Sequence, residues 1–415
     1  MAPRRAEASA PASVGRPGGA AASELPAPPA HAADVSRALS RRIAGAIRDA
    51  GGWIGFDRYM QMALYEPGLG YYAAGSRKFG ADGDFVTAPE LSPLFGECVA
   101  AQCAHWFGSA PAEVVEFGAG SGALAAQLLA ALQALGAPPT RYRIVELSAE
   151  LRERQRELLA ARVPALLERV SWLDALPPAL DGVIVANEVL DAMPVRLFRW
   201  RDGEIAERGV ASAPAGDGFV FADRAADDAF AGRVRRTLVE AWGAGGEPRG
   251  DFVSEIGEQA DAWVETVGAR LTRGAMLLID YGFPRAEYYH PQRATGTLLC
   301  HFRHRVHVDP FLWPGLQDVT AHVDFTAIGR AARRAGLAVL GYNSQARFLL
   351  DCGLLERLAS RPRDDARAWA QQAQAVQQLL SEAEMGELFK AIAVGRDVPD
   401  DAPGFATRDR RHVLE

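Results

Sequence analysis

The chain of 415 residues is 49% hydrophobic and 23% charged, as is typical of a globular protein, and its formal net charge is −7. That negative charge argues against nonspecific nucleic-acid binding as its main task. Its four cysteines form no Cys-x-x-Cys pair and no apolar run reaches about 18 residues, so we expect no disulfide framework, no zinc ribbon and no membrane-spanning helix.

The N-terminal residues 1–33 are mostly Ala, Pro, Gly and Ser, and we expect a disordered tail because they hold too little apolar surface to fold. Acidic residues among the few arginines argue against an organelle transit peptide, and the start lacks the apolar core of a secretory signal. We therefore expect a cytoplasmic location of bacterial type rather than the mitochondrial matrix.

Two helices and a long loop are predicted next. Apolar residues at every fourth position from Val35 predict a helix that ends at Gly51, and residues 53–65 predict a second helix. Residues 65–97 are dense in glycine, proline and aromatic residues, so they form either a plain connector or a lid over a ligand. The lid hypothesis places Thr87 and Pro89 beside that ligand. We treat residues 34–110 as one N-terminal unit.

Strands alternate with helices in the middle of the chain. Continuous apolar strands separated by helices predict an α/β fold, with a mostly parallel sheet covered by helices on both faces. The strands are expected at 114–117, 142–146, 170–173, 182–187 and 275–281, and the first two helices at 122–135 and 148–162. These elements divide into two halves of one core, residues 111–194 and 274–395.

An inserted lobe is expected at residues 195–273. A hairpin around Asp202-Gly203 opens it, and helices near 225–242 and 258–270 follow. After residue 325 we expect a helix, a strand at 337–342 and further helices to about 394. Residues 396–415 are predicted to be a flexible tail.

The first core strand runs into the pattern Glu116-x-Gly118-x-Gly120-x-Gly122. A strand, a tight glycine turn and a helix N-terminus let a ligand approach the backbone closely. The glycines fit the dinucleotide fingerprint only weakly, and their register resembles motif one of the class I S-adenosylmethionine methyltransferases. The acid would repel a dinucleotide phosphate but attract the amino group of S-adenosylmethionine. The alternative is that Glu116 is a solvated strand end.

Acidic residues also follow the next two strands. Glu146 at the end of the second strand can accept hydrogen bonds from ribose hydroxyls. Asp174 after the third strand can face the adenine amino group, although a loop or helix-capping role is the alternative.

The segment after the fourth strand reads Asn187-Glu188-Val189-Leu190-Asp191. Ligands of open parallel sheets bind beyond the carboxyl ends of the strands, so Asn187, Glu188 and Asp191 are our candidate catalytic residues on the methyl side of the cofactor. Two carboxylates three residues apart can share one face of a turn and hold an arginine guanidinium. The alternative is a capped, solvated turn.

Histidines are concentrated in CHFRHRVH, residues 300–307. A spacing of three suits ligands on one helix face, but the flanking sequence suggests extended or loop structure, so we expect no metal site. A partner-binding or peptide-binding loop is the favoured interpretation. His301 and His304 therefore join Asp280 and Tyr281 as candidate substrate-binding residues.

Several longer segments resemble one family, the S-adenosylmethionine-dependent methyltransferases that include the mitochondrial complex I assembly arginine methyltransferase and its bacterial relatives. The resemblance covers about residues 36–395. It implies a class I methyltransferase fold, S-adenosylmethionine as cofactor and S-adenosylhomocysteine as product. It also implies a protein arginine acceptor, for the mitochondrial member on a complex I subunit. Another methyl acceptor and a non-catalytic assembly factor are the alternatives, whereas Glu116 and Glu146 argue against a nicotinamide-dependent oxidoreductase. The segments are 83–97, 115–125, 186–195, 278–284 and 296–325.

Overall fold

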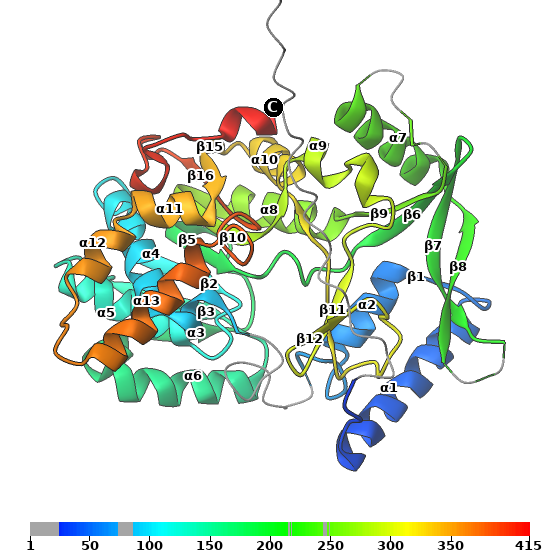
Figure 1. Ribbon diagram of the computed structural model, residues 1–415, viewed down its shortest axis with the longest axis horizontal. Helices are drawn as coiled ribbons and strands as arrows, with labels where there is room; N and C mark the ends of the chain where they lie inside the picture. Colours follow the sequence, from blue (N-terminus) through cyan, green and yellow to red (C-terminus); the bar gives the residue numbers. More distant parts are fainter. Residues whose placement is uncertain (1–24, 74–85, 215, 217, 244–246, 249) are drawn as a thin grey trace, which may run out of the picture.

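The computed structural model describes residues 25–73, 86–214, 216, 218–243, 247–248 and 250–415. Its fold is α/β, as predicted (Figure 1). The central sheet has eight strands in the order β15-β16-β10-β5-β2-β3-β4, with β14 beside β10. Their bounds are β2 Glu113–Phe117, β3 Arg141–Val145, β4 Val170–Leu173, β5 Leu180–Asn187, β10 Leu271–Phe283, β14 Val323–Asp324, β15 Ala338–Ser344 and β16 Phe389–Arg396.

The strands β4, β3, β2, β5 and β10 run parallel, while β16 is antiparallel to both β10 and β15. The sequence predicts helices up to about residue 394, and β16 corrects that prediction. Its apolar run, FKAIAVGR, is buried over almost its whole length. A short apolar run has no alternation that would distinguish a buried strand from a buried helix.

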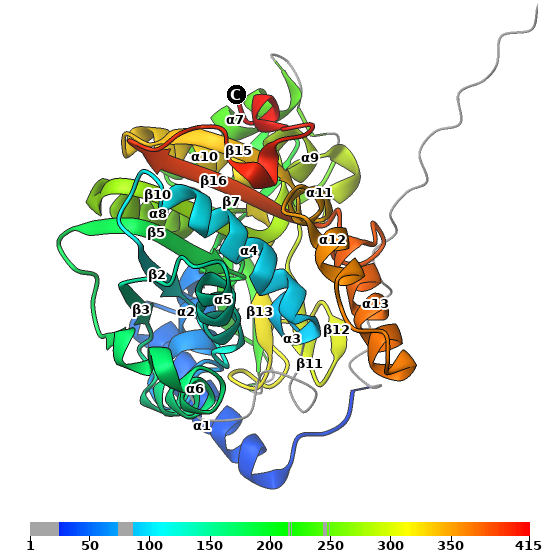
Figure 2. The ribbon, with the colours of Figure 1, turned by 90° about the vertical axis from the view of Figure 1, so that its left-hand side faces the viewer.

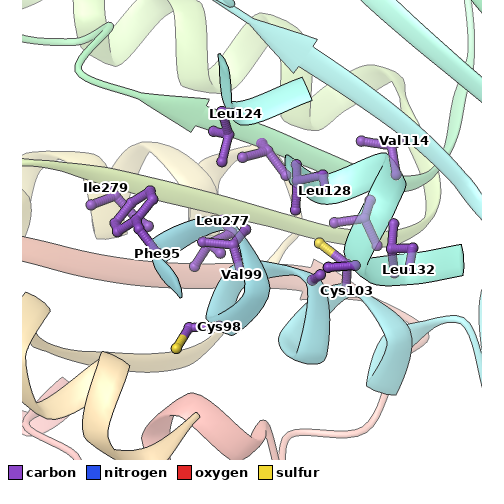
Figure 3. Packing of buried hydrophobic residues seen from close by; sticks show 14 of the residues in the cluster. Phe95, Cys98, Val99, Cys103, Val114, Leu124, Leu128, Leu132, Leu277 and Ile279 are labelled. Carbon is purple, nitrogen blue, oxygen red and sulfur yellow. The ribbon is translucent and has the colours of Figure 1, made fainter. Parts of the chain in front are cut away.

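Helices cover both faces of this sheet, because successive strand residues point to opposite sides. On one face lie α4 and α5 (Figure 2), and there Val114 and Leu277 pack with Phe95 of α4 and Leu128 of α5 (Figure 3). On the other face, Val115 packs with the side chains of α8 and α10. The helices around the core are α3 Ala88–Leu91, α4 Pro93–Trp106, α5 Ala123–Ala134, α6 Ala149–Arg162, α8 Glu258–Arg270, α10 Phe325–Arg334, α11 Gln345–Asp351, α12 Leu354–Ala359 and α13 Ala366–Leu380.

A second sheet of five strands forms the inserted lobe, in the order β1-β7-β6-β9 with β8 beside β7. Its first strand comes from residues 54–55, so the N-terminal segment completes the sheet of a lobe inserted much later in the chain. The first two helices pack against it in a shared apolar cluster. The bounds are α1 Ala30–Asp49, β1 Ile54–Gly55, α2 Phe56–Tyr65, β6 Arg196–Arg201, β7 Glu204–Ser212, β8 Phe219–Ala225, α7 Asp228–Trp242 and β9 Phe252–Ile256.

A third, small sheet lies beside α2, in the order β12-β11-β13. Its strands are β11 Leu299–Phe302, β12 Arg305–His307 and β13 Asp318–Thr320, which confirms that the histidine-rich segment is extended. The remaining elements are short helices and turns of 3-10 helix: η2 Pro164–Arg169, α9 Arg285–Tyr288, η3 Pro291–Arg293, η4 Pro403–Phe405 and η5 Arg411–Leu414.

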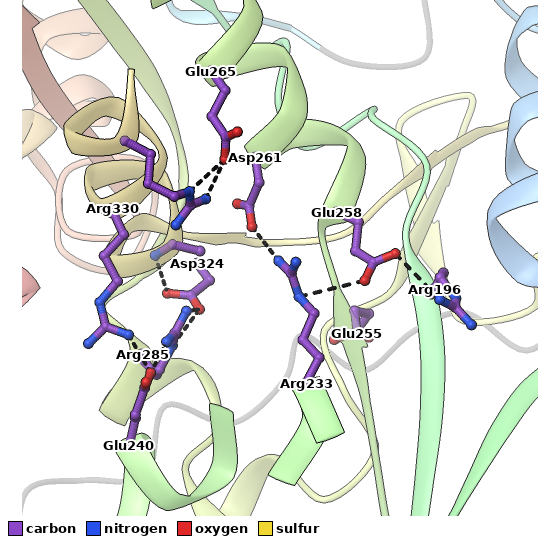
Figure 4. Close-up of polar contacts among 12 residues, drawn as sticks. Arg196, Arg233, Glu240, Glu255, Glu258, Asp261, Glu265, Arg285, Asp324 and Arg330 are labelled. Carbon is purple, nitrogen blue, oxygen red and sulfur yellow. Dashed lines mark hydrogen bonds and ion pairs between the residues drawn. The ribbon is translucent and has the colours of Figure 1, made fainter. Parts of the chain in front are cut away.

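Ion pairs connect the inserted lobe to the core (Figure 4). Arg233 of α7 pairs with Glu258 of α8 at 3.6 Å, and the same glutamate lies 3.5 Å from Arg196 of β6. On the neighbouring side, Arg285 pairs with Glu240 of α7 and also, at 2.9 Å, with Asp324 of the core. Single exposed pairs contribute little to stability, so this network mainly fixes how α7 and β6 lie against α8.

Three further predictions need correction. Residues 93–106, which begin inside the predicted loop 65–97, form the buried helix α4. Residues 396–415 are not a free tail, because they contain η4 and η5 and bury Leu414 against the core. The predicted N-terminal tail already turns helical at Ala30, while residues 1–24 lie outside the described residues. Over the ranges that the structure describes, no helix combines the length and apolarity needed to cross a membrane.

Candidate functional site

A cavity of about 1150 Å³ lies beyond the carboxyl ends of β2, β3, β5 and β10. This is where ligands bind in open parallel sheets. The core contributes the glycine turn and the strand ends. The segment before α4, the small third sheet and residues 385–389 complete the walls.

The glycine turn forms one wall. Gly118, Gly120 and Gly122 have φ angles of 65°, 53° and 86°, in the left-handed region that favours glycine. A Cβ atom on Gly118 would lie 2.6 Å from Cγ2 of Val189, so a larger residue would displace the segment after β5. Gly118 and Gly120 line the cavity, whereas Gly122 packs against Gln155 of α6.

Glu116 lies in the cavity wall with 1% of its surface exposed, which rules out the solvated strand end considered as the alternative. Its Oε2 accepts a hydrogen bond of 2.5 Å from the hydroxyl of Tyr142. Burial raises the pKa of Glu116 to about 7, and the hydrogen bond from Tyr142 partly offsets that rise. A ligand amino group beside it would supply the missing positive charge.

The next two acids differ from each other. Glu146 lines the cavity and accepts hydrogen bonds from the amide of Ser148 at 2.9 Å and from Gln155 Nε2 at 3.2 Å. Asp174 does not line it: its side chain is 87% exposed and pairs with Arg152 at 2.5 Å. Asp174 thus lies outside the described cavity lining, where it pairs with Arg152, and its contact with the adenine amino group stays a prediction.

The predicted lid is described from residue 86 onward, and residues 74–85 lie outside the described residues. Val86, Thr87, Pro89 and Glu90 line the cavity. Two contacts join this segment to the glycine turn and to α5: the Ser121 hydroxyl donates to Glu90, and Gln127 donates to the carbonyl oxygen of Pro89 at 2.7 Å. Thr87 and Pro89 thus line the cavity, and both their contact with the cofactor and the closure of this segment stay predictions.

The segment after β5 forms the opposite end of the cavity, and Asn187, Glu188 and Asp191 all line it. Glu188 has φ 55°, an unusual left-handed conformation for a residue other than glycine. The Asp280 carboxylate accepts the amide hydrogens of residues 189, 190 and 191 at 3.1, 2.8 and 3.3 Å. Asp280, predicted to bind substrate, lies behind the cavity wall and holds this segment in place.

The carboxylates at this end are poorly compensated. Burial, followed by the charge of Asp191, raises the pKa of Glu188 to about 8. Burial also raises the pKa of Asp191 to about 6, although a hydrogen bond from Tyr281 lowers it. Among the described residues, Asp191 Oδ1 has no hydrogen-bond partner. Among the described lining residues there is no lysine or arginine, but there are seven carboxylates: Glu90, Glu116, Glu146, Glu150, Glu188, Asp191 and Asp318.

The histidine-rich segment is only partly brought to the site. His301 and Tyr281 line the cavity, while His304 lies exposed in the turn between β11 and β12. No cluster suited to hold a metal ion occurs in the described part of the chain.

The cavity is also lined by three residues that the sequence did not single out, Tyr65, Tyr72 and Asp318. The only available signal for Asp318 was its place in the segment 296–325.

Comparisons with known proteins point to one family. Residues 98–343 match the family described as "Putative S-adenosyl-L-methionine-dependent methyltransferase". The proteins named "Protein arginine methyltransferase NDUFAF7, mitochondrial" are 27% identical in Danio rerio, over 87% of each chain, and 31% identical in Mus musculus, over 72% of this chain and 71% of that protein. A methyl transferase candidate from Burkholderia thailandensis, crystallised with S-adenosyl-homocysteine, is 51% identical, with a TM-score of 0.89 over 94% of this chain and all of that one.

The names of these curated relatives also bear on location. The expectation of a bacterial-type cytoplasmic location is wrong by this comparison, since the curated relatives from fish and mouse are mitochondrial proteins. The argument from acidic residues in the N-terminal segment was a weak one, because composition alone carries little information on targeting.

Proposed function

Because the chain belongs to the family of S-adenosyl-L-methionine-dependent methyltransferases, we propose that its methyl acceptor is an arginine side chain of a protein. The cofactor is S-adenosylmethionine, and the Burkholderia relative holds the corresponding product. The residues at the glycine turn suit this cofactor, since left-handed glycines allow close approach and the buried Glu116 can pair with an amino group. The bound cofactor supplies a methyl group on a positively charged sulfur.

The observation that carries the arginine proposal is the acidic end of the cavity. Asp191 is buried and Glu188 is partly buried, and no cationic side chain lines the described walls. Buried carboxylates are costly unless they are paired or hydrogen-bonded. A guanidinium group carries a permanent charge and five N–H donors in one plane, so it would satisfy both carboxylates at once. The names of the curated relatives support the same acceptor.

The chain's residues then have separate roles. Glu188 holds the guanidinium, and the entering positive charge lowers the pKa of this carboxyl again. Asn187 donates to Glu188 at 2.8 Å and fixes the orientation of the carboxylate. The reacting nitrogen loses one proton as the methyl group is transferred, and Asp191 Oδ1 accepts it, since this atom has no hydrogen-bond partner in the described part of the chain. Alignment of the nitrogen with the methyl group supplies much of the rate enhancement.

The protein that carries this arginine is a narrower question. The resemblance found in the sequence implies a subunit of respiratory complex I, and we keep that as a prediction. Mass spectrometry of the source proteome, with and without the gene, would identify the acceptor through an arginine methylation that disappears. Wild-type protein should restore the mark and Glu188→Gln should not. Loss of methylation on another residue type would contradict the arginine proposal, and an unchanged methylome would favour a non-catalytic assembly factor.

A further inference from the structure

Asp318 lies at the start of β13, in the small third sheet, yet it lines the same cavity as Glu188 and Asp191. Only 3% of its surface is exposed. The hydroxyl of Tyr72 donates a hydrogen bond of 2.9 Å to its Oδ2 atom. A third carboxylate therefore reaches the acidic end of the cavity from outside the methyltransferase core.

Two sets of contacts fix the position of β13 relative to the core carboxylates. The first is direct: the amide of Ala321, just after β13, donates to the carbonyl oxygen of Asp191 at 3.0 Å. The second passes through two tyrosines. Tyr65 donates to the carbonyl oxygen of Ala192 at 2.9 Å, and its ring stacks on Tyr72 at 5.5 Å between centroids. Asp318 is thus held at a set position beside the core segment.

The pKa shifts of Glu188 and Tyr72 agree with the closeness of both residues to Asp318. Burial is the main reason that the pKa of Glu188 is raised, and the charges of Asp191 and Asp318 add to the effect. Burial and then the charge of Asp318 raise the pKa of the Tyr72 hydroxyl well above its ordinary value, so Tyr72 stays a hydrogen-bond donor at neutral pH. A carboxylate has about four lone-pair sites, so it can accept hydrogen bonds from several donors.

We propose that Asp318 binds the acceptor guanidinium from the side of the third sheet, and that Tyr72 positions Asp318 for this contact. This inference rests on the proposed arginine acceptor. A planar guanidinium has more donors than one carboxylate can accept, so carboxylates on two sides of it match its shape. A lysine ammonium has only three donors around one point and gains less from that arrangement. Asp318 thereby contributes to the choice of arginine over lysine.

Binding to the full-length protein saturated with S-adenosylhomocysteine tests this without requiring turnover. The probes are acetyl-Gly-Arg-Gly-amide and its lysine counterpart, measured by calorimetry. Asp318→Asn should weaken binding of the arginine peptide by about 10- to 100-fold, the range for a lost hydrogen bond to a charged group, and should narrow the preference over lysine. Affinity for S-adenosylhomocysteine should change less than about twofold, because Asp318 lies at the acceptor end.

The controls separate a direct role from a general one. Asp309→Asn removes a charge from an exposed residue next to the same sheet and should leave both affinities within about twofold of wild type. Tyr72→Phe keeps the ring but loses the hydroxyl, and should weaken arginine binding by about 3- to 10-fold. Because Tyr72 acts through Asp318, the double variant should bind as weakly as Asp318→Asn alone, while additive losses would overturn the positioning role.

The remaining outcomes are distinct. Equal arginine binding by wild type and Asp318→Asn would overturn the inference. If wild type binds the arginine peptide tightly and Asp318→Asn does not, but arginine is never methylated in the presence of S-adenosylmethionine, the inference stands and the proposed function falls. If wild type does not bind the arginine peptide at all, both are overturned.

Discussion

At the cofactor end of the cavity, the strand, glycine turn and helix come from one short stretch of chain, β2 to α5. At the acceptor end, the carboxylates come from the segment after β5 and from β13, and Asp280 of β10 anchors the first of these. The cofactor end therefore depends on local backbone shape. The acceptor end exists only when segments distant in the sequence have packed together.

The two ends also differ in how well their acids are satisfied. Glu116 accepts from Tyr142, and Glu146 accepts from Ser148 and Gln155. By contrast, one buried oxygen of Asp191 has no hydrogen-bond partner within the ranges that the structure describes, and Glu188 has a left-handed backbone. Strained backbone and unpaired buried acids cost free energy, and they persist where the surrounding structure holds them. The acids of the cofactor end thus have hydrogen-bond partners within the protein. At the acceptor end, Asp191 lacks one of its partners among the described residues, which agrees with the proposal that a cationic side chain binds there.

The largest expected effect is at the glycine turn. Gly120→Val should abolish measurable binding of S-adenosylhomocysteine, a loss of more than about 100-fold, since a β-branched residue strongly disfavours φ near 53° and would fill space beside the ligand. Calorimetry measures this, and Gly45→Ala in α1, where the nearest atom is 3.8 Å away, is the control. Binding within about threefold of wild type would show that the turn does not contact the cofactor.

The acceptor end should respond in the opposite way. Glu188→Gln should lower the rate of arginine methylation by roughly 30- to 1000-fold, as expected for a lost charge-assisted contact worth about 2–4 kcal/mol. Cofactor affinity should change by less than about tenfold, because the cofactor contacts come from the other end. Rates are measured with tritiated S-adenosylmethionine. Full activity of the variant would mean that the Asn187–Asp191 segment is only a capped turn.

A change of pH should have an effect of intermediate size on the affinity for the arginine peptide. The pKa of Glu188 is raised to about 8 by burial, so this carboxyl is mostly protonated at pH 7 in the free protein. A guanidinium, which stays charged, binds the ionised form, so binding releases a proton below pH 8. Affinity for the arginine peptide should rise up to about tenfold per pH unit between pH 6.5 and 8, then level off. Glu188→Gln should remove this slope, and a slope that survives would assign it to another group.

The smallest effect distinguishes the two acids of the adenosine side. Glu146→Gln should weaken binding of S-adenosylhomocysteine by about fivefold, because a buried hydrogen-bond network changes. Asp174→Asn, which is exposed and paired with Arg152, should change it by less than about twofold. An equal loss of S-adenosylhomocysteine affinity in both variants would show that Asp174 also contacts the cofactor.

Local patterns were sufficient for some elements and not for others. The strands at 170–173 and the helix at 258–270 lie where the sequence predicted them, because their apolar spacing matches one period. Helix α4 was missed because glycine and proline near its start resemble loop sequence, and it is apolar nearly all round. The third sheet was expected only as extended or loop structure, since its strands are short and their partners are distant in the chain.

The sequence by itself determined the core fold, the glycine turn and the position of Glu116 beside that turn, because each follows from residues adjacent along the chain. At the acceptor end the sequence pointed to Asn187, Glu188 and Asp191, which line the cavity, but only the tertiary structure decided the rest. In the tertiary structure Asp280 lies behind the cavity wall, and Asp174 and His304 lie outside the cavity. Packing of β13 against the core places Asp318 close to Asp191. The reason is physical: a parallel sheet collects the carboxyl ends of its own strands, but a side chain from another sheet arrives only through long-range packing and hydrogen bonds.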